Sequence, residues 1–214
     1  NHGATPAFPK STIHDILSAW DIEPGDTIYV DTGEYPPFAD SVRVDQFSTW
    51  MPEWGTNLSS LVQGLATNRV LIQGSTNDTA GGTLLVKAGG GVGVLLEDAS
   101  GVMLRDLAVR DAATGIRALR SHYATLDRVR CIGGGAGISV ERSDSATVKN
   151  SIVRNTSGRG ITFSDSLSGL IRNVTLWSNR FYGVVQEAPV LSRGDLSVEN
   201  SLIGTFGSNS FAYL

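Results

Sequence analysis

The sequence is poor in cysteine and has no long uninterrupted apolar segment, and each absence excludes a class of protein. Cys131 is the single cysteine of the 214-residue chain, so neither an intrachain disulfide nor a cysteine-based metal cluster can form, and no metal site is predicted. No apolar run reaches the about 18 residues that a transmembrane helix needs. The net charge of −4 provides no excess of Lys and Arg for phosphate contacts, so nucleic acid is not an expected partner.

Glycine is abundant, with 25 residues against 7 prolines, and its positions are periodic. A glycine followed by an apolar residue recurs at spacings of 22, 22, 23 and 23 residues, at Gly93-Val94, Gly115-Ile116, Gly137-Ile138, Gly160-Ile161 and Gly183-Val184. The next apolar residue follows two positions later, at Leu96, Ala118, Val140, Phe163 and Val185 or its neighbour. This alternation predicts a strand with one buried face in every unit. We therefore expect Ile116, Ile138, Ile161 and Val184 to stack in one interior column, and Cys131 to be a buried apolar residue.

A second pattern in each unit predicts a bend between two strands. Its third position is flanked by apolar strand residues and reads Asp106, Arg128, Asn150, Asn173 and Asn200. Asn and Asp tolerate left-handed backbone geometry and bond to nearby main chain, so we expect buried Asn150 and Asn173 side chains that bind the main chain of adjacent coils. The spacings of 22, 22, 23 and 27 residues place about four extra residues around 188–191, predicted to protrude as a loop.

A period of about 22 residues with three short strands favours an all-β fold, a right-handed single-stranded parallel β-helix in which neighbouring coils stabilise one another. Residues 11–21 predict an N-terminal capping α-helix, with Ser11 as N-cap and an apolar face of Ile13, Ile16, Leu17 and Trp20. We expect a single domain over residues 1–214, with an irregular excursion at 36–69 and regular coils of about 22–23 residues at 93–214.

The segment from Ser11 to Tyr35 resembles the N-terminal cap and first coil of the pectate-lyase-like superfamily. The resemblance rests on its Thr-Ile-His-Asp-Ile-Leu helix, its Pro-Gly-Asp-Thr-Ile-Tyr-Val turn and strand, and its Asp-Thr-Gly-Glu-Tyr exit. The later Gly-Ile and Asn-rich units are similar to the β-helix repeats of that superfamily. The resemblance implies the fold and leaves the chemistry open, because the same coils serve in lyases, hydrolases, epimerases, phage tailspikes and bacterial surface proteins.

The sequence lacks the catalytic motifs that such enzymes carry. The Asn-x-Asp, Asp-Asp, Gly-His-Gly and Arg-x-Lys motifs of pectinase-like hydrolases are absent. A lyase would need an Arg or Lys base, often with a calcium ion held by Asp and Glu. A mixed-charge stripe follows the first strand of each unit, at Glu97, Leu119, Glu141, Ser164 and Glu187 with Asp98, Arg120, Arg142 and Asp165. Its expected role is a solvated, ion-paired face. His122 is expected to be a plain turn histidine, since no carboxylate is placed by sequence to orient it.

Candidate carbohydrate-binding residues form a second stripe on one predicted sheet, Arg110, Arg130, Arg154 and Trp177. Arginine could hold an acidic sugar chain while the Trp177 ring stacks on a sugar face. The alternative to ligand binding is that these exposed side chains only cover the aliphatic portions of neighbouring side chains. Trp50 and Trp54 could also stack on sugar, or could pack the excursion against the cap.

Two classes of function remain. The first is an extracellular or cell-surface β-helix module, non-catalytic, that serves as a rigid scaffold or as a polysaccharide-binding or adhesion segment of a larger protein. The second is an enzyme that degrades acidic polysaccharide, a lyase or a glycosidase. No cofactor is expected, apart from calcium if the chain is a lyase. The chain starts at Asn1 without a Met and ends at Phe211-Ala212-Tyr213-Leu214 inside an apolar pattern, so we expect its C-terminal end to be continued by more coils, another domain or a second copy.

Overall fold

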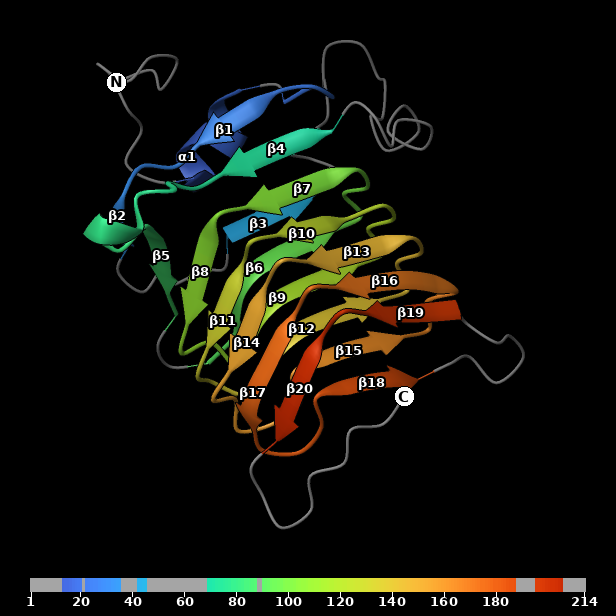
Figure 1. Cartoon of the computed structure of the whole chain (residues 1–214). Helices are drawn as coiled ribbons and strands as arrows, with labels where there is room; N and C mark the ends of the chain where they lie inside the picture. Colours follow the sequence, from blue (N-terminus) through green and yellow to red (C-terminus); the bar gives the residue numbers. More distant parts are fainter. Residues whose placement is uncertain are drawn as a thin grey trace.

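The computed structural model describes residues 13–20, 22–35, 42–45, 69–87, 90–187 and 195–205. Its strands form three parallel sheets, each built from equivalent strands of successive coils that stack along the solenoid axis (Figure 1). Sheet A comprises β1 (Thr27–Tyr29), β4 (Val70–Gln73), β7 (Val102–Arg105), β10 (Thr125–Asp127), β13 (Ala146–Lys149), β16 (Ser168–Arg172) and β19 (Asp195–Glu199). Sheet B comprises β2 (Gly33–Tyr35), β5 (Thr83–Val86), β8 (Leu107–Arg110), β11 (Arg130–Ile132), β14 (Ile152–Arg154), β17 (Thr175–Asn179) and β20 (Leu202–Thr205). Sheet C comprises β3 (Val42–Asp45), β6 (Val92–Glu97), β9 (Thr114–Leu119), β12 (Ala136–Glu141), β15 (Ile161–Ser164) and β18 (Val184–Glu187).

The chain visits sheets A, B and C in turn, and every strand pairs in parallel with its equivalent one coil away. The predicted β-helix is therefore confirmed. Strand β3 lies within the range predicted as an irregular excursion, where it pairs with β6 and completes the first coil. Residues 36–41 and 46–68 of that range lie outside the described residues, as do the insertion at 188–191 and the final residues from Phe206 to Leu214.

The helix α1 (Ile13–Ala19) lies at the N-terminal end of the solenoid beside β1 (Figure 1). Its Ile13 and Leu17 side chains are buried in the same core cluster as the strands, and Ile16 packs against that cluster. This confirms the capping helix, while Ser11, its predicted N-cap, lies outside the described residues. Trp20, expected on the same face, is 44% exposed, because it follows the last residue of the short helix.

The core is built from side-chain columns that run along the solenoid axis. Ile116, Ile138, Ile161 and Val184 are paired in register and are at most 2% exposed, so the predicted interior column is confirmed. Cys131 is also buried, and this burial raises the pKa of its thiol to about 12. The neighbouring column on sheet C, which contains Phe163, ends at Gln186, because Gln186 pairs with Phe163. Val185 pairs instead with Thr162, whose side chain points outward.

Each coil turns its corners with residues in the left-handed backbone region. The predicted bend between sheets A and B has φ values of 55° at Asp106, 52° at Arg128 and 52° at Asn150. Asp98, Arg120, Arg142 and Asp165 take the same conformation where β-strands of sheet C end. Arginine at such a position pays a steric cost that Asn avoids, so the 22-residue alignment, and not residue type, identifies these corners.

At the corner between sheets C and A, buried serines rather than asparagines provide hydrogen-bond acceptors for main-chain N–H groups. Ser121 and Ser143 are 0% exposed and Ser166 is 3% exposed. The Oγ of Ser143 accepts the N–H of Ser121 at 2.8 Å, and the Oγ of Ser166 accepts the N–H of Ser143 at 3.0 Å. Each hydroxyl also donates to a carbonyl two residues back in its own coil. This serine ladder therefore provides partners for amides that have no access to water.

Ile138→Asp should lower the free energy of unfolding by several kcal/mol, because it places a carboxylate without partners in the apolar column. Ile152→Asp is the matched control, since Ile152 is 39% exposed on the outer face of β14. Urea titration of both variants measures the difference. Equal stability of the two variants would contradict the register.

Ser143→Ala should cost about 1–3 kcal/mol, because the buried N–H of Ser121 loses its acceptor. Ser139→Ala, on the outer face of β12, removes a hydroxyl that donates to the Glu141 side chain and should change stability by no more than about 0.5 kcal/mol. A loss in Ser143→Ala no larger than in this control would show that the ladder contributes nothing.

Candidate functional site

All four described residues of the predicted stripe lie on the outer face of sheet B. Arg110 and Arg154 both pair with Ile132, and Arg154 also pairs with Trp177, so these residues share one column. Arg130 lies two residues before Ile132 on β11 and belongs to the neighbouring outward column. The stripe therefore spans two columns of one sheet. Trp50 and Trp54 lie outside the described residues.

Two of the three arginines are already held by carboxylates. The Arg110 guanidinium contacts Glu34 at 2.9 Å and Asp111 at 3.3 Å. Arg130 reaches across to Asp78, at 3.5 Å, in the 3₁₀-helix η1 (Asp78–Ala80). These contacts neutralise both cations. They fit the alternative in which the arginines only cover the aliphatic portions of neighbouring side chains.

Arg154 and Trp177 differ from the other members of the stripe. Arg154 is exposed and forms no ion pair within the described part of the chain. Trp177 is 45% exposed, and a Cβ added to Gly204 would lie 2.6 Å from the Cε3 atom of its ring. The indole therefore lies over the glycine of β20, with one side against the sheet. We call Arg154, Trp177 and Gly204 the sheet B platform.

Exposed aliphatic residues flank this platform. Ile152 and Leu202 are 39% and 60% exposed, and both pair with Thr175 in the adjacent outward column. Phe181 is 47% exposed beyond the end of β17, and the Arg180 guanidinium lies 5.6 Å from the centre of its ring. Apolar surface thus lies at one end of sheet B beside Arg154, which has no ion pair among the described residues, as in sites where a ligand has both apolar and anionic groups.

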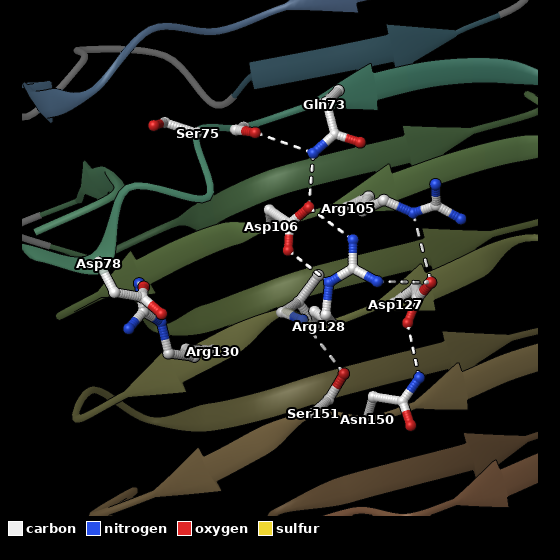
Figure 2. Close-up of polar contacts among 12 residues, drawn as sticks. Gln73, Ser75, Asp78, Arg105, Asp106, Asp127, Arg128, Arg130, Asn150 and Ser151 are labelled. Carbon is white, nitrogen blue, oxygen red and sulfur yellow. Dashed lines mark hydrogen bonds and ion pairs between the residues drawn. The ribbon is translucent and has the colours of Figure 1, made fainter.

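A second polar cluster, which the sequence patterns had not indicated, lies at the bend between sheets A and B (Figure 2). Arg128 grips Asp106 through two hydrogen bonds, of 2.6 and 2.8 Å. Asp127 is 3% exposed and accepts a hydrogen bond of 2.9 Å from Asn150. Arg105, Arg128 and Lys149 lie 3.3, 3.7 and 3.9 Å from the Asp127 carboxylate. One sequence pattern could have revealed this cluster, namely charges of alternating sign at the coil period, as in Arg105, Asp127 and Lys149.

The charges of this cluster bind one another across coils, which favours a structural role. The hydrogen bonds from Arg128, together with one from Gln73 and the charge of Arg105, hold the pKa of Asp106 below its usual value although burial opposes this. The buried Nε of Arg105 has no hydrogen-bond partner despite its ion pair with Asp127. An ionised, fully engaged carboxylate cannot readily exchange a proton with a substrate.

The predicted asparagine column forms a ladder, but on the outside of the solenoid. Asn173 donates to the Oδ1 atom of Asn150 at 3.1 Å, and Asn150 donates to Asp127. Both asparagine side chains belong to exposed residues and bind side chains, so the prediction that they are buried against main chain is wrong. Their left-handed φ angles turn the side chains outward, while Ser151, one residue later, points inward and accepts the N–H of Val129.

The mixed-charge stripe on sheet C is laced with ion pairs, as expected. Arg120 binds Asp98 and Glu97, at 2.6 and 3.1 Å. Arg117 binds Glu141 through two hydrogen bonds. Partial burial works to raise the pKa of Glu141, but the hydrogen bonds from Arg117 and Ser139 outweigh it, so this pKa is lowered.

A column of Ser100, His122 and Asp144 carries the residue types of a catalytic triad on three successive coils. The sequence had placed no carboxylate near His122, yet its Nδ1 lies 3.7 Å from an Asp144 oxygen. That Nδ1 accepts the backbone N–H of Asp144 at 3.1 Å, so the ring proton belongs on Nε2. A triad base needs the opposite arrangement, with Nδ1–H donating to the carboxylate.

The described residues include no group of three or more His, Cys, Asp or Glu side chains arranged to hold a metal ion. Among them there is also no helix with the length and apolarity needed to cross a membrane.

Asp106 should contribute to stability in a pH-dependent manner. Because its pKa is lower in the folded than in the unfolded chain, its contribution is complete above the unfolded value of about 3.9 and is lost as the pH falls through the folded value. Asp106→Asn should therefore flatten the acid side of the stability profile measured by urea unfolding. Asp78→Asn, at an exposed aspartate, is the control. A wild-type acid slope retained in Asp106→Asn would contradict this linkage.

The family model described as a right-handed β-helix region matches residues 92–212, more than half of the chain. No curated protein and no solved structure matches the chain. The matched region contains the regular coils from β6 onward, whose three parallel sheets and stacked apolar columns are described above. The chain belongs to the right-handed β-helix family, within the pectate-lyase-like superfamily.

Proposed function

We propose that this chain is a non-catalytic, polysaccharide-binding module of an extracellular or cell-surface protein, and that the sheet B platform contacts the glycan. The observation that carries the proposal is the Trp177 indole, which lies over Gly204 and remains 45% exposed beside Arg154. A fixed aromatic face next to an arginine that has no carboxylate partner in the described part of the chain suits a ligand that has an apolar ring face and acidic groups.

The geometry favours binding without a large loss of side-chain freedom. Trp177 and Arg154 lie on adjacent strands in register, so the coil spacing of about 4.8 Å sets their separation. The Cβ position of Gly204 is filled by the indole, which restricts the tilt of the ring. A site built on strands is held more precisely than one built on loops, and a long sheet face accommodates an extended polymer.

The non-catalytic part of the proposal rests on the state of the charged groups. Asp106, Asp127 and Glu141 are engaged by arginines, and His122 carries its ring proton on the wrong nitrogen for a triad. The extracellular or surface location is inferred by analogy with the superfamily, whose fold alone assigns no function.

Trp177→Ala and Arg154→Ala should each weaken binding to immobilised polygalacturonate or alginate by about tenfold or more, equivalent to about 1.4 kcal/mol. Affinity is measured by biolayer interferometry, and the arginine contribution should fall as salt is raised. The controls are Tyr29→Ala, at a tyrosine 80% exposed on sheet A, and Arg172→Ala, at an arginine paired with Glu199. No binding to any acidic or neutral polysaccharide would contradict the proposal, and release of unsaturated uronates would replace it with the lyase alternative.

Gly204→Ala tests the platform without touching an exposed residue. The added methyl group would lie 2.6 Å from the ring, so the indole must tilt away from the sheet. Binding should weaken severalfold while thermal stability changes little. Gly81→Ala, at a glycine with open space around its Cβ position but a left-handed φ of 89°, controls for glycine replacement on the same side of the solenoid.

A further inference from the structure

Side chains link four successive coils at the corner between sheets C and A. The Oγ of Ser100 accepts the N–H of His122 at 3.1 Å, and the Nδ1 of His122 accepts the N–H of Asp144 at 3.1 Å. The Oδ1 of Asp144 in turn accepts the N–H of Leu167 at 2.6 Å. We call this series the corner ladder. Each member holds the main chain of the next coil, so three side-chain acceptors add to the serine ladder at this corner.

One rung of the corner ladder can be lost by protonation. An imidazole nitrogen accepts a hydrogen bond only while it carries no proton. The His122 side chain is 38% exposed, so protons from solvent reach it directly. Histidine ordinarily changes charge near pH 6.5, whereas a serine hydroxyl and an ionised aspartate keep their acceptor atoms at that pH.

The carboxylate of Asp144 offers the charged ring a new partner. Its Oδ2 atom lies 3.7 Å from the Nδ1 atom of His122, while its other oxygen holds Leu167. A proton on Nδ1 therefore removes an acceptor for one backbone amide and creates a donor for this carboxylate. Both contacts use the same nitrogen, so they cannot coexist.

Other ionisable groups at this corner are engaged elsewhere or lie in the flanking turns. Asp98 is held by Arg120 through two hydrogen bonds. Arg142 and Asp165 occupy the positions that precede the corner ladder in the two following coils. Tyr123 follows His122, and its N–H donates to the carbonyl of Asp144. Within the described part of the chain, Asp144 is the ionisable group that faces His122 at ion-pair distance.

We propose that His122 is a proton-operated contact between coils. In its neutral form it holds the Asp144 amide; in its charged form it releases that amide and pairs with the Asp144 carboxylate. The neighbouring Ser121 and Ser143 keep their buried hydrogen bonds in both states. The change is therefore confined to the corner between sheets C and A, which loosens in mild acid while the core stays intact.

NMR spectroscopy between about pH 5 and pH 8, the range in which histidine ordinarily changes charge, tests the exchange. Above the titration midpoint the ring of His122 should show its proton on Nε2. On acidification the amide of Asp144 should shift with the same midpoint, and its protection against hydrogen exchange should fall by about two- to tenfold. The amides of Ser121 and Ser143 should be unaffected.

Two variants separate the steps. His122→Asn places an amide oxygen where Nδ1 lies and does not titrate, so the Asp144 amide should stay protected throughout; loss of one histidine signal also assigns the resonance. Asp144→Asn keeps an acceptor for Leu167 but removes the charge, so the charged ring should lose its ion-pair partner. A ring proton on Nδ1 above the midpoint, or an Asp144 amide that ignores the titration, would overturn the proposal.

Discussion

In-register pairing of parallel strands is the constraint on which the rest of the structure depends. Each strand bonds to its equivalent one coil away, so a residue type that recurs at the coil period becomes a column. A β-branched residue after each recurring glycine gives a dry interior column, and a serine two residues after β9, β12 and β15 gives a buried ladder of hydroxyls. No coil could bury these faces alone, and stability is therefore shared between neighbours.

In-register pairing also separates charged residues that bind one another across coils from those that do not. At the bend between sheets A and B, charges of opposite sign alternate from coil to coil and bind one another, with Asp127 at the centre. On sheet C, Arg117 and Arg120 are likewise engaged by Glu141, Glu97 and Asp98. Arg154 stands apart from this pattern within the described residues, and it does so beside an exposed indole. That difference, rather than the number of arginines on sheet B, is what supports the proposed glycan contact.

Corners contribute a different kind of property. The interior serine ladder and the corner ladder run side by side, at adjacent positions of the same turns. The first is buried and made of hydroxyls, which do not titrate. The second is half exposed and contains an imidazole and a carboxylate. A solenoid can therefore carry proton-sensitive contacts on its edge without placing its core at risk, because the two sets of hydrogen bonds share no atoms.

The sequence by itself determined the fold, because the 22–23-residue spacing of Gly-Ile pairs and of corner residues leaves few arrangements that align them, and it determined the interior position of Ile138 and Cys131 for the same reason. Only the tertiary structure decided which polar groups are buried. Ser143 lies inside and Asn150 lies outside, although both recur at the coil period. At a left-handed corner, a shift of one residue along the chain moves a side chain from the outer face to the interior. Only the tertiary structure separated Arg154 from Arg110 and Arg130, because their carboxylate partners, Glu34 and Asp78, come from coils 76 and 52 residues earlier in the chain. Partners at such separations leave no local pattern, so the sequence could indicate a stripe of arginines but not which of them lacks a carboxylate partner among the described residues.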